Sequence, residues 1–155
     1  MTFRIRGICV AEIEPYVGLS DDELHALSAR RVIADRPHAF PDRVELRDAE
    51  PGERLLLLNY EHQPARSPYR ASHAVFVLED ALRRYDRVGE IPALLRRRII
   101  SARAFDEQGM IVDAALCPGS ELEATIDQLM HLERTAYLHL HYAKHGCFAC
   151  KVERA

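Results

Sequence analysis

The sequence predicts an α+β domain in which an antiparallel sheet, either open or barrel-like, carries two main helices. Two three-residue loops that end in glycine, at 107–109 and 144–146, are typical of β-hairpins. Four consecutive leucines, at 55–58, are typical of a strand buried on both faces. Two Ser-x-x-Glu capping boxes, at 20–23 and 120–123, mark the beginnings of the two helices.

Length, charge and composition limit the function classes. At 155 residues the chain is long enough for one domain with a sizeable core, so we expect a single domain over residues 1–155. The formal net charge of -3 lacks the basic excess of a nucleic-acid binder, and no apolar run is long enough to cross a membrane. The N-terminus lacks the apolar stretch of a secretory signal, which predicts a cytoplasmic location and reduced cysteines.

Before the first hairpin, alternating patterns, capping signals and prolines predict a series of strands and short helices. In chain order these are strands at 2–10, 31–35, 43–47, 54–62 and 74–78, and helices at 20–29, 80–85 and 92–97. In the strand at 54–62, a period of two places His62 on one face and Asn59 on the other. The polar loop at 63–73 contains Tyr69, which is either a lid residue or an anchor that packs the loop down.

The first hairpin pairs 98–106 with 110–116 and sets Arg103 opposite Asp113. Arg103 lies in a mainly apolar strand. Its planar guanidinium either clamps a carboxylate or phosphate, or pairs with Asp113 across the two strands. After Ser120, a helical stripe predicts an amphipathic helix packed on the sheet, with its buried face formed by Leu122, Ile126, Leu129 and Met130.

The second hairpin places two histidines on one polar face. Its loop pairs His141 with Ala149, and His139 with Lys151. The apolar face then carries Leu138, Leu140, Tyr142, Phe148, Cys150 and Val152. The other face carries both histidines and Cys147, with Cys147 diagonal to His141.

The polar face formed by His139, His141 and Cys147 supports three interpretations. A histidine beside a thiol favours the thiolate, which would make Cys147 a nucleophile with His141 as its acid–base partner. The two histidines, with His62 or Cys147, could instead hold a divalent metal ion. The face could also be a solvated surface without a ligand. Cys147 and Cys150 lie three residues apart on a strand and point to opposite faces, so we assign Cys150 to the core.

Arg43, Asn59 and His62 are further polar candidates. Arg43 follows a proline and an aspartate, and it is either a second anion clamp or the partner of a nearby carboxylate. Asn59 and His62 end the central strand, where such side chains line sites or serve as hydrogen-bonding tethers. No GxSxG, P-loop, GxGxxG or HExxH pattern occurs, so no standard signature identifies a reaction.

Segments spread over most of the chain are similar to one protein family. They are FPDRVEL at 40–46, DAEPGE at 48–53, LNYEHQP at 58–64, SPYRAS at 67–72, VFV at 75–77, RAFD at 103–106, HLHYA at 139–143 and GCF at 146–148. In these segments the sequence resembles the bacterial domain of unknown function called DUF1203, which often has a cysteine where this chain has Asp42. The resemblance implies no established activity. It implies shared polar positions at Arg43, Asn59, His62, Tyr69, Arg103, His141 and Cys147.

These positions predict a pocket for a small anionic ligand, either binding or catalytic. The ligand-binding residues would be Arg43, Asn59, His62, Tyr69 and Arg103. His141 and Cys147 would supply acid–base or nucleophilic chemistry. One alternative is a non-catalytic, homodimeric interaction domain whose polar positions are structural, and another is a His/Cys metal-binding protein. We expect no nucleic-acid or membrane partner, and no cofactor under the first hypothesis.

Overall fold

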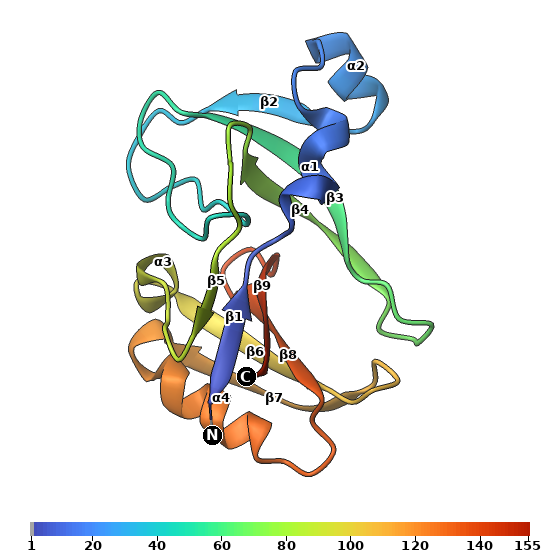
Figure 1. The fold of residues 1–155 in the computed structure, drawn as a ribbon, viewed down its shortest axis with the longest axis vertical. Helices are drawn as coiled ribbons and strands as arrows, with labels where there is room; N and C mark the ends of the chain where they lie inside the picture. The colour runs from blue at the N-terminus through green and yellow to red at the C-terminus, as the bar shows by residue number, and fades with distance from the viewer. Residues whose placement is uncertain (1) are drawn as a thin grey trace.

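The computed structural model describes residues 2–155, which form two antiparallel sheets with short helices around them (Figure 1). The elements are β1 (Phe3–Arg6), α1 (Val10–Ile13), η1 (Glu14–Tyr16), α2 (Asp21–Ala26), β2 (Arg30–Ile33), β3 (Arg54–Gln63), β4 (Ala71–Leu78), β5 (Asp86–Val88), α3 (Ala93–Arg96), β6 (Ile99–Phe105), β7 (Ile111–Pro118), η2 (Gly119–Glu121), α4 (Leu122–Met130), β8 (Tyr137–Tyr142) and β9 (Phe148–Arg154). The larger sheet has the order β5-β1-β9-β8-β6-β7, and the smaller has the order β2-β3-β4. The predicted α+β class with antiparallel pairing is confirmed, and the described strands form open sheets rather than a closed barrel.

The two predicted helices are present, and one of them begins as the capping box requires. In α2 the Ser20 hydroxyl accepts a hydrogen bond from the Glu23 backbone N–H, and the Glu23 carboxylate accepts one from Ser20 N–H. The second capping box does not form, because the chain first makes the 3₁₀ turn η2 and α4 begins only at Leu122. The leucine run lies in β3, the central strand of the smaller sheet, as its composition predicts.

Three predictions for residues 1–85 are wrong. Residues 43–47 form a loop rather than a strand, because the buried Asp42 carboxylate accepts backbone hydrogen bonds from Glu45 and Leu78 and curls the chain against β4. No helix forms at 80–85; that segment leads into β5, which pairs with β1. The first strand ends at Arg6 rather than Val10, and the next residue, Gly7, packs so closely on the Val44 carbonyl that a Cβ would overlap it.

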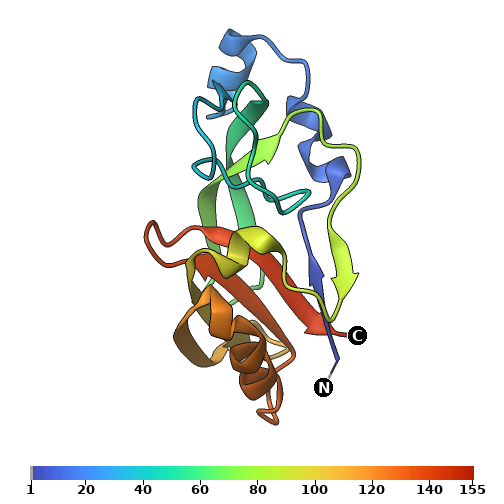
Figure 2. The same ribbon diagram turned by 90° about the vertical axis from the view of Figure 1, so that its left-hand side faces the viewer.

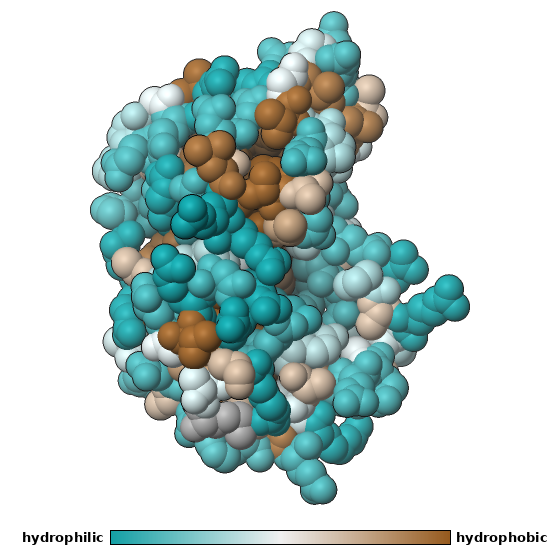
Figure 3. All heavy atoms as spheres, in the orientation of Figure 1, coloured by the Kyte–Doolittle hydropathy of each residue, from teal (hydrophilic) through white to brown (hydrophobic). Residues whose placement is uncertain are grey.

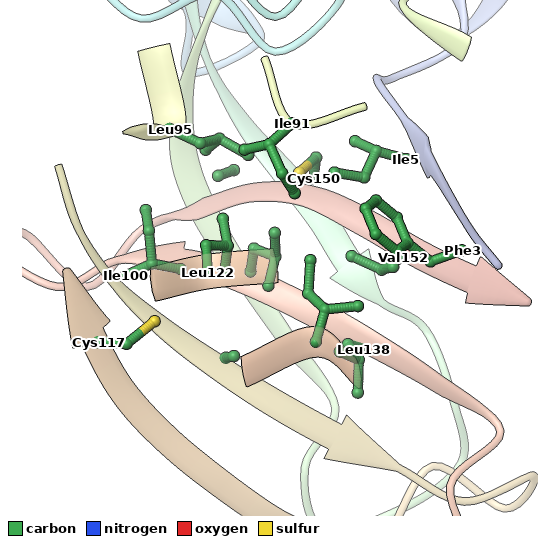
Figure 4. Packing of buried hydrophobic residues seen from close by; sticks show 14 of the residues in the cluster. Phe3, Ile5, Ile91, Leu95, Ile100, Cys117, Leu122, Leu138, Cys150 and Val152 are labelled. Carbon is green, nitrogen blue, oxygen red and sulfur yellow. The ribbon is translucent and has the colours of Figure 1, made fainter. Parts of the chain in front are cut away.

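The larger core lies between the six-stranded sheet and the helices α3 and α4. Figure 4 shows Leu122 of α4 and Leu95 of α3 meeting Ile100, Leu138 and Cys150 of the sheet. A second core lies under the smaller sheet and contains Leu24, Leu55, Leu56, Val75 and Val77, among others. Burying a leucine side chain stabilises the fold by roughly 2 kcal/mol, so the alternating leucines of β8 fix which face of that strand remains for polar groups.

The smaller sheet and α4 lie at opposite ends of the molecule, with the six-stranded sheet between them (Figures 1 and 2). The far end of the β3–β4 hairpin therefore meets the face of the larger sheet that α4 leaves open. Gln63 of β3 donates a hydrogen bond to the Tyr137 hydroxyl of β8 over 2.9 Å, which fastens the two sheets together there. The polar face of β8 is thus buried by a strand from the other sheet.

Candidate functional site

Four histidines meet where the two sheets touch. His62 and His73 come from β3 and β4, and His139 and His141 come from β8. We call these four residues the histidine cluster. His139 and His141 share one face of β8, as residues two apart on a strand must, so that prediction is confirmed. A register irregularity between Tyr60 and Gln63 leaves both His62 and Gln63 buried.

Three members of the cluster, His62, His139 and His141, form a triad. Each offers one ring nitrogen, and these three nitrogens all lie within 4.8 Å of one another. Nδ1 of His62 is 3.4 Å from Nδ1 of His139, and Nε2 of His62 is 2.6 Å from Nδ1 of His73. The three side chains are almost completely buried, with exposed fractions of 8%, 3% and 0% in chain order. Such spacing suits nitrogen ligands that converge on one point.

His141 has a fixed tautomer and one free nitrogen. Its Nδ1 lies 2.9 Å from the Gly146 carbonyl oxygen, and a carbonyl only accepts, so Nδ1 carries the hydrogen. The other nitrogen, Nε2, therefore presents a lone pair. It is buried and has no hydrogen-bond partner among residues 2–155. Buried polar atoms are nearly always paired, so this atom requires an explanation.

Burial keeps the triad neutral. Loss of water lowers the pKa of His62 to about 4, of His139 to about 2 and of His141 to about 3. Neighbouring positive charge adds to this: Arg103 lowers the pKa of all four histidines in the cluster. At neutral pH the rings are unprotonated, and their lone pairs are available.

Phe148 closes one side of the triad, contrary to the register expected for the second hairpin. Strand β9 does place Lys151 opposite His139, but an irregularity after Leu140 pairs His141 with Phe148 instead of Ala149. The Phe148 ring then leaves the predicted apolar face and stacks on His62, with 4.9 Å between ring centroids. The His62 ring of the triad is thus packed against an aromatic side chain.

Arg103 lies directly opposite His139 in the β6–β8 pair. The predicted pairing with Asp113 is wrong: a register shift in the first hairpin sets Arg103 opposite Ala114 and Asp113 opposite Ala104. Asp113 is exposed, and its carboxylate accepts from the Ala114 backbone. Arg103 is half-buried, its Nε donates to the Ser101 hydroxyl over 3.3 Å, and it makes no ion pair within residues 2–155.

Arg43 and Cys147 lie beside the cluster but contact each other. The Arg43 guanidinium is buried; Nε donates to the Phe148 carbonyl over 2.9 Å, Nη1 to the Pro41 carbonyl over 2.6 Å, and Nη2 to Cys147 Sγ over 3.0 Å. Each nitrogen of this guanidinium therefore has a protein acceptor. The structure gives Cys147 this contact with Arg43 in place of the expected one with His141.

Two other predicted residues lie outside the cluster. Asn59 is exposed on β3, opposite Ala74 of β4. Tyr69 is 41% exposed in the loop between β3 and β4, where its ring approaches Phe105. Sequence reasoning missed His73, because it began the strand at 74. The residues at 71–74, Ala-Ser-His-Ala, show no strict polar/apolar alternation, so the sequence carries no clear signal that the strand begins at Ala71.

A groove of about 210 Å³ leads from the surface to the triad. It reaches His62 and His139, and its walls include Cys9, Glu12 and Tyr60. Figure 3 shows the hollow between the two sheets on the face seen in Figure 1. The Tyr60 hydroxyl donates to Glu12 over 3.1 Å, and burial together with this contact raises the pKa of Tyr60. The groove thus provides a route toward His62 and His139, whereas His141, the most buried member of the triad, is not part of its lining.

These features define an α+β protein with a buried histidine site. The model of the family described as "Protein of unknown function (DUF1203)" matches residues 39–154, and the chain belongs to this family. The match confirms the resemblance seen in the sequence, and its range includes the whole histidine cluster. No curated protein and no solved structure gave a match. Among the residues that the structure describes, no helix is long and apolar enough to span a bilayer.

Proposed function

We propose that the protein binds one divalent transition-metal ion, such as Zn²⁺, Co²⁺ or Ni²⁺, through His62, His139 and His141. The observation that carries this proposal is the buried Nε2 of His141, which has no partner although its ring is fixed by Gly146. A histidine that donates one N–H to a backbone carbonyl and presents its other nitrogen to a shared point has the arrangement of a metal ligand.

Imidazole ligands favour a transition-metal ion over calcium or magnesium. Neutral imidazoles suit zinc, copper, iron and nickel, whereas calcium and magnesium prefer oxygen ligands. His73 supports the same assignment, because its Nδ1 lies 2.6 Å from Nε2 of His62 and can fix that ring with Nδ1 facing His139. Three protein ligands leave a further position on the ion, as in zinc sites that bind substrate or water rather than sites that only stabilise a fold.

A second candidate is a site for a small anionic molecule without a metal. The half-buried Arg103 beside His139 favours it, because no carboxylate within residues 2–155 pairs with this guanidinium. In this version His141 supplies a neutral hydrogen-bond acceptor. Arg43 and Cys147 contribute less than the sequence suggests, since they contact each other.

Metal titration of untagged protein tests the first candidate. The protein is stripped with a chelator and dialysed, and Zn²⁺ and Co²⁺ binding is measured by calorimetry and by elemental analysis. We expect one ion per chain. His141→Phe, which keeps an aromatic ring but no nitrogen, removes a ligand and should weaken binding by more than the roughly 10–100-fold that loss of a partner outside the ligand set costs.

Exposed histidines of the same chain supply matched controls. His131 and His145 are exposed, so His131→Ala and His145→Ala remove an imidazole without touching the triad. Both control variants should bind as the unmodified protein does. Binding that is substoichiometric, or that survives unchanged in His141→Phe, would refute the metal proposal. Anion binding by metal-free protein, lost in an Arg103 variant, would then support the second candidate.

A further inference from the structure

We propose that the metal ion at the triad takes a small oxyanion as an additional ligand, and that Arg103 holds this oxyanion. This inference rests on the metal proposal above and names the class of molecule that the site would bind. It combines the proposed metal site with the proposed anion site, because one oxyanion would contact both the metal ion and the Arg103 guanidinium.

The first support is the incomplete hydrogen bonding of Arg103. Among residues 2–155, its only hydrogen bond is the 3.3 Å contact from Nε to the Ser101 hydroxyl, and it forms no ion pair. Arg43, which is more buried, instead donates from all three of its nitrogens to Phe148, Pro41 and Cys147. A half-buried guanidinium whose two terminal nitrogens lack acceptors is suited to receiving an external anion.

The second support is the position of Arg103 relative to the triad. It is the direct cross-strand neighbour of His139, and Ser101 is the neighbour of His141. Side chains opposite each other in an antiparallel pair lie on the same face with Cβ atoms roughly 5 Å apart. The guanidinium therefore lies on the face of the sheet from which His139 and His141 reach the triad.

The third support is charge balance. The triad consists of histidines alone and brings no negative charge to a divalent ion. A metal ion next to an arginine that has no carboxylate partner places like charges together in a region of low dielectric constant. An oxyanion between them is attracted by both charges. The planar fork of arginine favours a carboxylate or phosphate, which accepts two parallel hydrogen bonds.

The test uses Co²⁺-loaded protein, because the visible spectrum of Co²⁺ reports its ligands. Acetate, oxalate and inorganic phosphate are added separately, with chloride at equal ionic strength as the reference. We expect at least one oxyanion to change the spectrum saturably, and the three additions identify whether the ligand is a carboxylate or a phosphate. In Arg103→Met this oxyanion should bind at least about tenfold more weakly, and Arg103→Lys should be intermediate.

Two further measurements separate this inference from the metal proposal and from misfolding. Without added anion, Arg103→Met should bind Co²⁺ more tightly than the unmodified protein, because a repelling charge is gone; a variant with a damaged fold would bind it more weakly. Arg70→Met, which removes an exposed arginine paired with Glu61, should match the unmodified protein in both assays. Stoichiometric Co²⁺ with no oxyanion response, or equal responses with and without Arg103, would overturn the inference alone. Failure to bind Co²⁺ would overturn both proposals.

Discussion

Arg43 donates a hydrogen bond to the sulfur of Cys147 over 3.0 Å, across more than a hundred residues of sequence. The same guanidinium lies 5.0 Å from the ring centroid of Tyr142 and donates to the backbone of Phe148. It thereby ties the loop after Pro41 to the terminal hairpin that carries two of the triad histidines. In this structure Arg43 is a tether that positions the hairpin.

Replacement of Arg43 by methionine should destabilise the fold strongly. Loss of the guanidinium removes its donors to the buried Phe148 carbonyl and the partly buried Pro41 carbonyl, and each buried group left unsatisfied costs about 1–3 kcal/mol. We expect the free energy of unfolding in urea to fall by about 3 kcal/mol or more. Arg43→Lys should restore little of this stability, because the three hydrogens of one ammonium nitrogen cannot reach the three separate acceptors that the guanidinium contacts. Arg36→Met removes an exposed arginine and is the control; equal stability of both methionine variants would contradict the tether.

Replacement of His73 by alanine should weaken metal binding without abolishing it. His73 lies 2.6 Å from the Nε2 of His62 and stacks on the same ring, so it orients a triad member from outside the triad. Partners of this kind typically contribute about 10–100-fold in metal affinity. Calorimetric Zn²⁺ titration measures the change, with the exposed His25→Ala as control. An unchanged affinity would show that His62 needs no orientation by His73.

The metal-free protein should lose stability as the pH falls below about 6.5, the ordinary histidine pKa. Burial lowers the folded pKa of His62 to about 4, of His141 to about 3 and of His139 to about 2. Between these values and about 6.5 the unfolded chain binds protons that the folded chain does not. Each histidine then subtracts about 1.4 kcal/mol from the free energy of unfolding per pH unit.

A variant isolates the part of this pH dependence that comes from one ring. In His139→Leu the slope between pH 6 and pH 5 should decrease by about 1.4 kcal/mol per pH unit. Urea unfolding of chelator-treated protein at pH 7.5, 6 and 5 provides the slopes. Parallel curves for the variant and the unmodified protein would mean that His139 is not buried as a neutral ring.

An ion pair far from the triad should contribute pH dependence in a lower range. The buried Glu79 carboxylate accepts two hydrogen bonds from Arg31, over 2.6 and 2.8 Å, which lower the pKa of Glu79. The ion pair stabilises the fold fully above the unfolded glutamate pKa of about 4.3. This stabilisation is lost as the pH falls through the lower pKa that Glu79 has in the folded protein. Glu79→Gln should therefore reduce the free energy of unfolding at pH 7 by about 1–2 kcal/mol, because the partly exposed Arg31 keeps Asp21 and the Leu19 carbonyl as partners. The difference from the unmodified protein should shrink below about pH 4, and a constant difference across this range would exclude the ion pair as its source.

Strand alternation predicted the faces of β8 correctly, because leucines alternate with His139 and His141 and only the leucines belong to the larger apolar core. Hairpin register was less predictable. The extra residue near Ala149 and the shift after Ala104 are bulges, and short sequences do not specify which residue a bulge leaves unpaired. These two shifts moved Phe148 to the triad and separated Arg103 from Asp113.

The convergence of the triad depended on a contact between sheets that no local pattern encodes. His62 lies in the three-stranded sheet and His139 in the six-stranded sheet. Periodicity gives the direction of each side chain relative to its own sheet but not the placement of one sheet against the other. The sequence therefore supported a metal interpretation only as one of several alternatives, and it left out His73.

Two separate parts of the sequence line the groove. Its histidines lie within the family range of residues 39–154, whereas Cys9 and Glu12, on its outer wall, precede that range. The segment that carries them follows β1, an inserted strand between β5 and β9 of the larger sheet. Exchange of residues 9–12 would thus alter which molecules are admitted, by size and charge, while the nitrogen atoms beneath stay as they are. Under the proposed function, the groove wall at residues 9–12 could therefore vary while the histidine ligands stay the same, although Tyr60, Lys151 and Glu153 of the same wall lie inside the family range.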